Sequence, residues 1–315
     1  MPLLRFIPET TNVDFVGWRW YAFGADGLLM VLSIVAMLYQ GFNLGIDFTG
    51  GVRVEAKAAH TITEAELGTI RAELAGLRFG ETQVQYIGGN ACDKPVNSCV
   101  QIRVQPHDVS GGVVTDRVRR QLGSAYTIRN TEVIGPKISG ELFQRGVLAT
   151  VLAVLVISIY VWFRFEWQYG IGALIATGHD VFVTAGFFSF FHIDFTINTV
   201  AALLLLAGYS INDTVVVFDR IRENRRKYKR MSLPDMINLS TNQIATRTSL
   251  VSVATALSVV PLLFGGPVLY NFSIAILFGI FVGTFSSTYV AAALLLYLPP
   301  VGGGSSAGET AEATA

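Results

Sequence analysis

The sequence predicts an α-helical membrane protein with six transmembrane helices and an α+β domain inserted between the first and second of them. Only 15% of its 315 residues are charged and 51% are hydrophobic, whereas a soluble domain carries about 25% charged residues. Long apolar runs recur along the chain, and one segment, residues 45–140, lacks them. The formal net charge is zero, which gives no reason to expect binding to nucleic acid.

The first apolar run is long enough to cross a membrane. Residues 27–44 would form a helix roughly 27 Å long, close to the thickness of the hydrocarbon core. A cleaved signal peptide is the alternative, but it would have a shorter apolar core followed by a small-residue cleavage site. We therefore expect residues 1–26 to be a cytoplasmic N-terminus and residues 27–44 to be transmembrane helix 1.

Residues 45–140 are expected to fold as an α+β domain. Alternation with a period of two predicts strands over residues 51–57, 81–87, 99–105 and 125–134. Helices are expected over 63–77, with Thr63 and Glu66 as a capping box, and over 110–122. The order β-α-β-β-α-β is that of a ferredoxin-like unit. Because the domain contains no paired carboxylates, nucleophile–base set or phosphate loop, we expect a binding or lever module and not an enzyme.

Residues 141–298 are expected to contain transmembrane helices 2–6. The apolar runs are residues 146–163, 169–190, 198–218, 246–264 and 272–298. Gly279 and Gly283 form a GxxxG pair in the last run, a motif typical of close helix packing. Residues 299–315 are rich in Gly, Ser, Ala and Thr, which predicts a disordered cytoplasmic tail.

Lys and Arg residues in short loops set the orientation of a membrane protein. They concentrate between the predicted fourth and fifth spans, at Arg220, Arg222, Arg225, Arg226, Lys227, Lys229 and Arg230. Arg19 and Arg164 fall on the same side if there are six spans. We therefore expect both termini and this loop to be cytoplasmic and residues 45–140 to be outside, which in a bacterium is the periplasm. The loop is interpreted as a topology signal that contacts anionic lipid, with a specific partner site as the alternative.

Cys92 and Cys99 are the two cysteines of the chain. In an oxidising compartment they would close a small disulfide loop, and in a reducing one they would be free thiols. Sequence spacing leaves both readings open, because it does not establish the geometry. No CxxC motif or Cys/His cluster is present, so no metal site is expected.

Asp213, in the predicted fourth span, and Arg247, at the start of the fifth, are charges inside apolar segments. A charge at the centre of a span costs about 2.5–3.5 kcal/mol on insertion scales, so it usually has a role or a partner. The two spans are antiparallel neighbours, and the two side chains are expected at similar depth in a proton pathway. A direct pair and a pair through water are both open. The alternatives are a structural ion pair or hydrogen bond for Asp213 and, for Arg247, a side chain that reaches to the membrane surface.

Further polar residues lie near this pair and are candidates for a relay or for helix packing. Ser210 and Thr214 share nearly one helix face with Asp213. The remaining polar neighbours are Asn212, Thr246 and Thr248. His179 and Asp180, in the middle of the third span, would either join a relay or lock helices together, and both readings stay open.

Four stretches resemble motifs of one known family. Residues 42–51 (FNLGIDFTGG) are similar to the motif after the first span of the SecD/SecF family of protein-export membrane proteins. Residues 208–224 (GYSINDTVVVFDRIREN) resemble the fourth-span signature of that family. Residues 246–248 (TRT) and 179–180 (HD) resemble its fifth-span start and third-span pair. The resemblance covers roughly residues 27–298.

The resemblance implies an RND-type fold, after the resistance-nodulation-division superfamily, in the bacterial inner membrane. It implies assembly with SecD, with the SecYEG channel, and with YajC and YidC. The implied function is the use of the proton motive force to promote preprotein translocation after the SecA step, with Asp213 and Arg247 in the proton pathway. No cofactor is expected. The coupling ion is expected to be H⁺, and Na⁺ stays open because a carboxylate with hydroxyl neighbours serves either ion.

Two other functions are compatible with the same residues. One is a half-unit of a proton-driven small-molecule transporter of the same superfamily, although the short outer domain argues against a drug funnel. The other is a structural partner that anchors SecD without a proton role. An enzyme is the least expected class, because no constellation of nucleophile and base appears in the sequence.

Overall fold

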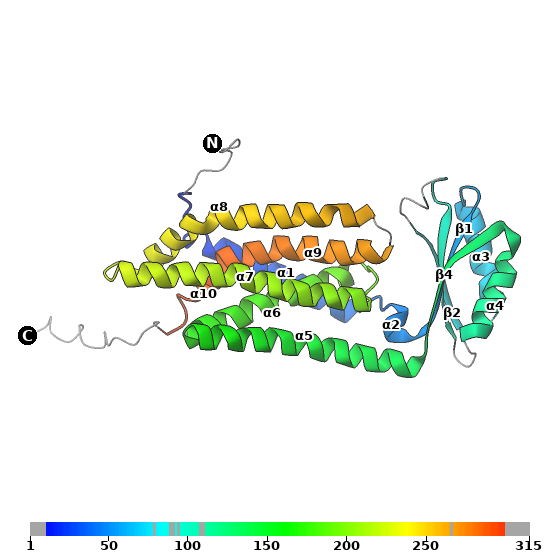
Figure 1. Cartoon of the computed structure of the whole chain (residues 1–315), viewed down its shortest axis with the longest axis horizontal. Helices are drawn as coiled ribbons and strands as arrows, with labels where there is room; N and C mark the ends of the chain where they lie inside the picture. Colours follow the sequence, from blue (N-terminus) through cyan, green and yellow to red (C-terminus); the bar gives the residue numbers. More distant parts are fainter. Residues whose placement is uncertain are drawn as a thin grey trace, which may run out of the picture.

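The computed structural model describes residues 11–77, 80–87, 92, 95–106, 111–264 and 267–299. Within these residues, six helices are long and apolar enough to cross a membrane, the number expected from the sequence. They are built on α1 (Arg19–Tyr39), α5 (Pro136–Arg164), α6 (Trp167–Phe190), α7 (Ile197–Lys227), α8 (Leu233–Val259) and α9 (Pro267–Phe285). They pack side by side as one bundle, with a small α+β unit at one end (Figure 1).

The α+β unit contains a four-stranded antiparallel sheet in the order β2-β3-β1-β4. Its elements are β1 (Gly51–Ala58), α3 (Glu64–Gly76), β2 (Gly80–Tyr86), β3 (Cys99–Pro106), α4 (Gly111–Leu122), a short helix η1 (Gly123–Ala125) and β4 (Tyr126–Ile134). The order of strands and longer helices is β-α-β-β-α-β, as expected. Thr63 caps α3 by accepting a hydrogen bond from the Glu66 amide at 3.3 Å.

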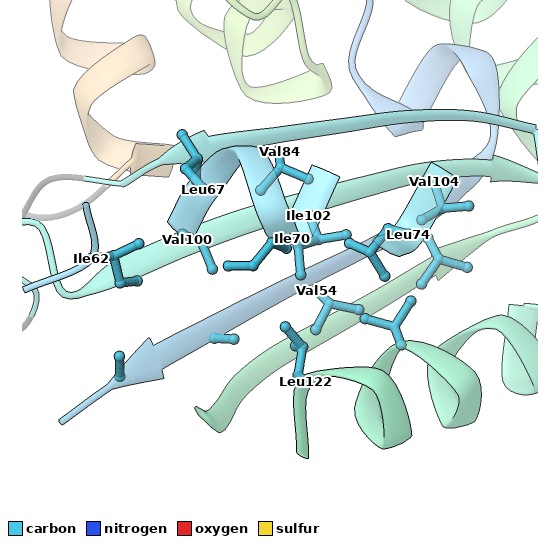
Figure 2. Close-up of a cluster of buried hydrophobic side chains, with 14 of the residues drawn as sticks. Val54, Ile62, Leu67, Ile70, Leu74, Val84, Val100, Ile102, Val104 and Leu122 are labelled. Atoms are coloured by element: carbon cyan, nitrogen blue, oxygen red, sulfur yellow. The ribbon is translucent and has the colours of Figure 1, made fainter. Parts of the chain in front are cut away.

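The core of this unit lies between the sheet and the two longer helices. Alternate residues of β1, such as Val52 and Val54, point into it and are fully buried, as are Ile102 of β3 and Val114 of α4. Figure 2 shows Val54 and Ile102 beside Leu74 of α3. Because α3 and α4 cover the face that points away from the bundle, the opposite face of the sheet turns toward the bundle (Figure 1).

Two helix boundaries differ from the expected ones in ways that matter for function. The first long helix covers Arg19–Tyr39 rather than residues 27–44, so Asp26 lies inside it. The eighth helix begins at Leu233 rather than near residue 246, so Arg247 lies about four turns into it. Ser232 and a proline in the first turn start α8. The residues that follow are largely polar, so a search for apolar runs does not detect this start.

The last membrane helix changes its winding near its end. After α9, residues Ser286–Ala291 (η3) form a π-helical turn that continues into α10 (Ala292–Leu294). A π-helical turn inside a helix is often found at a functional site. Both Ser286 and Ser287 are fully buried there.

Glycines allow the closest helix contacts of the bundle. A Cβ atom at Gly279 would lie 2.4 Å from the side chain of Leu206 on α7, and one at Gly283 would lie 3.4 Å from Asp180 Oδ2 on α6. The GxxxG pair therefore packs α9 against α6 and α7. At Gly186 on α6, a Cβ atom would lie 2.2 Å from the Cβ of Ser33 and 2.8 Å from its Cα on α1.

Gly186→Ala is expected to destabilise the contact between α1 and α6 by about 1–3 kcal/mol, because the added methyl group overlaps the Ser33 backbone. The matched control is Gly178→Ala on the same helix, where an added Cβ meets nothing within 4 Å. The thermal unfolding midpoint in detergent micelles measures both variants. A midpoint for Gly186→Ala at or above that of Gly178→Ala would contradict this packing.

The α+β unit is also expected to lose stability in acid. The Tyr126 hydroxyl donates a 2.5 Å hydrogen bond to Glu66 Oε1, and this bond, together with His60, lowers the pKa of Glu66 below its ordinary value of 4.5. A lowered pKa in the folded state gives stability that is present above pH 4.5 and is lost as the pH falls through the lowered value.

Tyr126→Phe should therefore reduce stability near neutral pH by about 1 kcal/mol and flatten its decline in acid. Hydrogen exchange of the amides of β1 and β3 as a function of pH measures both effects. An acid slope as steep in Tyr126→Phe as in the wild type would show that this hydrogen bond does not hold the Glu66 carboxylate.

Candidate functional site

Asp213 lies near the middle of α7 and is buried, with 3% of its surface exposed. Its Oδ2 atom is also buried and makes no hydrogen bond to any described residue. An unpaired carboxylate oxygen in a membrane bundle is costly. The site therefore suits a carboxyl group that binds and releases a proton, because the neutral form is less costly to bury.

Arg247 does not pair with Asp213. It makes no ion pair with any residue that the structure describes, and its side chain is exposed. It lines a cavity of about 660 Å³ together with Arg164 and Tyr160 of α5 and with Asp219, Arg220 and Glu223 of α7. Of the two arrangements left open, the direct pair is absent from this structure. Arg247 lines a charged cavity, and Asp213 is buried in the bundle.

The polar residues near the pair divide into buried and exposed ones. Ser210, Thr214 and Thr248 are buried, whereas Asn212 is exposed and Thr246 is half-buried. The Oγ1 atoms of Thr214 and Thr248 make no hydrogen bond to described residues. Both hydroxyls are thus able to donate or accept a further hydrogen bond.

A second polar contact links α7, α8 and α9. The Tyr209 hydroxyl donates to Ser252 Oγ at 3.0 Å, and Ser252 lies 2.8 Å from the hydroxyl of Thr284. Because these three residues come from three helices, they form a continuous line of hydroxyls through the bundle. Ser252 belongs to the polar face of α8 that also carries Thr248.

His179 and Asp180 lie on α6 in the centre of the bundle. His179 Nδ1 is 3.2 Å from Asp180 Oδ1, and Ser210 Oγ donates a 2.5 Å hydrogen bond to Asp180 Oδ2. On the other side of the ring, His179 Nε2 is 3.2 Å from Asp26 Oδ1 on α1. Sequence reasoning missed Asp26 because it placed this residue in the N-terminal segment, although the aromatic residues before it would have supported a longer helix.

The segment after α1 holds the α+β unit on the bundle. After α1 the chain forms a single helical turn, α2 (Ile46–Thr49). Within it, Asp47 Oδ2 accepts a 3.0 Å hydrogen bond from the Ile197 amide at the start of α7. An acidic side chain at a helix N-terminus stabilises it by about 0.3–1 kcal/mol. Gly51 follows with φ of +131°, where a Cβ would lie 2.5 Å from the Val104 carbonyl oxygen, so only glycine fits there.

A buried ion pair completes this junction. Arg103 of β3 binds Asp194, which lies in the loop between α6 and α7. The other carboxylate oxygen of Asp194 accepts a 2.8 Å hydrogen bond from Asn43 Nδ2. Since α7 begins directly after this loop and carries Asp213, the sheet is tied to the helix that bears the buried acid.

The two cysteines form a disulfide, with Cα atoms 5.2 Å apart. Cys92, Cys99 and Ile87 make a small buried cluster where β2 ends and β3 begins. Among the described residues, no group of three or more His, Cys, Asp and Glu side chains is arranged to hold a metal ion.

Residues 113–300 match a family model described as "Protein export membrane protein SecD/SecF, C-terminal". The chain belongs to the SecD/SecF family. Residues 35–62 also match the "SecD/SecF GG Motif", which covers α2 and the two glycines that lead into β1. The GG motif thus has a structural explanation, since it caps α7 and brings the first strand close to β3.

Individual relatives agree with this family. The SecF subunit of the protein translocase of Rhodobacter capsulatus is 39% identical over 308 residues, which are 94% of this chain and 91% of that protein. The SecDF protein of Brucella abortus is 38% identical, and the match covers 93% of this chain and 38% of that protein. The crystal structure of SecDF from Thermus thermophilus is similar with a TM-score of 0.81 at 34% identity, and the match covers 39% of that chain.

Proposed function

We propose that this chain acts as the SecF-type subunit of a Sec protein translocase and, together with SecD, uses the proton motive force to promote preprotein translocation after the SecA step. The observation that carries the proposal is the buried carboxyl of Asp213, which has an unpaired oxygen in the middle of a membrane helix. Each charge that crosses 100 mV gains about 2.3 kcal/mol, which is a usable driving force for moving an outer domain.

The position of Arg247 supports assembly with SecD. A guanidinium on a membrane helix is costly when it faces lipid, and Arg247 is exposed beside a charged cavity in the isolated chain. A second subunit covering this cavity would shield the arginine from lipid. The single-chain SecDF protein of Brucella abortus, of which this chain matches one part, supports SecD as that subunit.

We place the chain in the bacterial inner membrane with both termini in the cytoplasm. The last turns of α7 and the loop before α8 carry the Lys and Arg cluster, and they lie at the end of the bundle opposite the sheet (Figure 1). By the positive-inside rule this end is cytoplasmic, so the α+β unit, of ferredoxin-like order, is periplasmic. There it would contact translocating preproteins. The further partners that we propose are SecYEG, YajC and YidC.

The small-molecule transporter is the less favoured alternative. The relatives that match most of this chain are named as protein translocase subunits, and none of these names refers to a small-molecule substrate. The outer unit is a single small sheet with two longer helices, which leaves little room for a substrate funnel.

The proposal is tested by preprotein export in membrane vesicles that contain this chain with its SecD partner. We expect a protonophore to remove the stimulation of export that the chain provides, while the ATP-driven SecA step continues. A sodium ionophore should leave the stimulation intact if H⁺ is the coupling ion. Stimulation that persists when both gradients are collapsed would rule out gradient-driven export and favour a structural role.

A further inference from the structure

A line of polar side chains that does not include Asp213 crosses the centre of the bundle. It runs from Asp26 on α1 to His179 and Asp180 on α6 and ends at Ser210 on α7. The contacts along it are 3.2, 3.2 and 2.5 Å. All four residues are buried, and Asp180 and Ser210 have no exposed surface. Such a set of ionisable groups in the interior of a membrane helix bundle is expensive unless it is paired or functional.

The two acidic groups around His179 favour a bound proton. Each of its two ring nitrogens lies 3.2 Å from a carboxylate oxygen. A neutral imidazole has one N–H group and one lone pair, so one nitrogen would oppose the lone pairs of a carboxylate. A neutral ring between two ionised carboxylates would also leave two negative charges in the hydrocarbon region. The contact is favourable only if a proton resides on the second ring nitrogen or on one of the carboxyl groups.

No neighbouring residue offers another partner for these charges. His179 Nε2 and Asp26 Oδ1 lie at ion-pair distance, and neither atom makes a hydrogen bond to a described group, the other one included. α9 and the turn of residues 286–291 contain no charged residue, and the one titratable group in that turn, Tyr289, packs its ring against Phe15 and Phe285. The remaining titratable or charged groups lie on the elements packed against α1 and α6. They are Tyr270 of α9, Tyr209 and Asp213 of α7, the charged residues of the cytoplasmic end of α7 from Asp219 to Lys227, and Lys137, Glu141, Arg145, Tyr160 and Arg164 of α5.

Ser210 brings this line to the same face of α7 as Asp213. The two residues are three positions apart, which places their side chains on one side of a helix. Gly283 of α9 faces both Asp180 and Ser210, and the Cβ contacts it would make are only 3.4 and 3.5 Å. A larger residue at this position would crowd the hydrogen bond between Ser210 and Asp180.

We propose that Asp26, His179 and Asp180 form a second proton-binding site, which Ser210 links to Asp213. The inference rests on the proposed function in one respect, that a proton at Asp213 drives export. The second site holds one proton between α1 and α6, and its loss leaves two carboxylates facing each other across the imidazole. Protonation of this site thereby affects the contact between α1 and α6. The chain continues from α1 through α2 into β1, so this contact is connected to the sheet.

Infrared difference spectroscopy of the purified complex with SecD in liposomes tests this site without reference to export. The spectra compare acidic with alkaline buffer and record the imidazole and protonated-carboxyl bands. Asp26→Asn and His179→Gln should each remove bands that the wild type and the Asp213→Asn variant retain. Ser33→Ala is the matched control, because Ser33 is buried on α1 and bonds only to its own helix, at Leu29 O.

The export assay supplies the second measurement. In Asp26→Asn and His179→Gln, the pH at which gradient-stimulated export is half-maximal should move by about one unit or more, because removing an opposite charge at this distance shifts titration by about 1–3 units. Asp26→Glu serves as the second variant if Asp26→Asn assembles poorly. Because it keeps the carboxyl group, its pH profile should be that of the wild type.

The outcomes separate the two claims. Unchanged bands and an unchanged pH profile in Asp26→Asn and His179→Gln would overturn the second site, even if Asp213→Asn abolishes stimulation. A reduced amount of complex with a wild-type pH profile would also overturn it, because that result indicates a purely structural contact. Loss of the bands with full stimulation in Asp213→Asn would support the second site and remove the proposed role of Asp213.

Discussion

Asp213→Asn is expected to abolish the gradient-stimulated part of export, with a loss of about a hundredfold or more. Asparagine has nearly the shape of aspartate but does not bind or release a proton in this range. Since Asp213 Oδ2 has no hydrogen-bond partner among described residues, the substitution breaks no existing contact of that atom. The amount of assembled complex should therefore stay near the wild-type level, and the loss should appear in export alone.

Asn212→Asp is the matched control for this variant. Asn212 is the preceding residue on α7 and is exposed, whereas Asp213 is buried. An acid at position 212 therefore tests whether any carboxyl on this turn suffices. The double variant Asn212→Asp with Asp213→Asn should remain inactive. Recovery of stimulation in the double variant would show that the burial of Asp213 is not required.

Asp194→Ala is expected to give the largest loss of stability, about 3–5 kcal/mol. The substitution leaves the guanidinium of Arg103, only 4% exposed, without its carboxylate. It also removes the acceptor of the Asn43 hydrogen bond. Both contacts tie the sheet and the segment after α1 to the loop before α7, so the sheet should detach from the bundle more readily.

Limited proteolysis in the segments that join the sheet to the bundle measures this detachment. The control is Glu141→Ala, which breaks an exposed i,i+4 pair with Arg145 on α5 and should change stability by less than about 1 kcal/mol. Export should also fall in Asp194→Ala although Asp213 is intact. Without the ion pair, the sheet is no longer joined to the loop before α7, the helix that carries Asp213. Equal proteolysis rates in the two variants would contradict the role of the ion pair.

The sequence predicted the parts of the fold that follow from local patterns. The alternation of Val52 and Val54 with polar residues marks β1, and Thr63 marks the start of α3 as its N-cap. The other half of the expected capping box is not seen, because the Glu66 side chain contacts His60 and Tyr126 instead. Apolar length predicted six membrane helices, and those helices are present among the described residues. Each of these signals lies within about a dozen neighbouring residues, a window long enough for hydrophobic periodicity to be recognised.

The site was less predictable, because it depends on how each helix is rotated about its axis. Asp213 and Arg247 were expected at similar depth because their helices are antiparallel neighbours, and their pairing was left open. In the structure Asp213 is buried in the bundle, whereas Arg247 lines a cavity. The pairs Arg103–Asp194 and Asp26–His179 join residues far apart in the chain. No local pattern reports such contacts, and a start of α1 placed eight residues too late hid Asp26 altogether.

The central claim is that the proton gradient acts on export through the Asp213 carboxyl. The most direct measurement imposes a proton gradient on proteoliposomes that contain this chain, its SecD partner and the translocation channel. It then follows the completion of a preprotein already engaged by SecA, with wild-type chain or with Asp213→Asn. The account predicts that the gradient speeds completion with the wild type and has no effect with Asp213→Asn. Equal acceleration in both would contradict it.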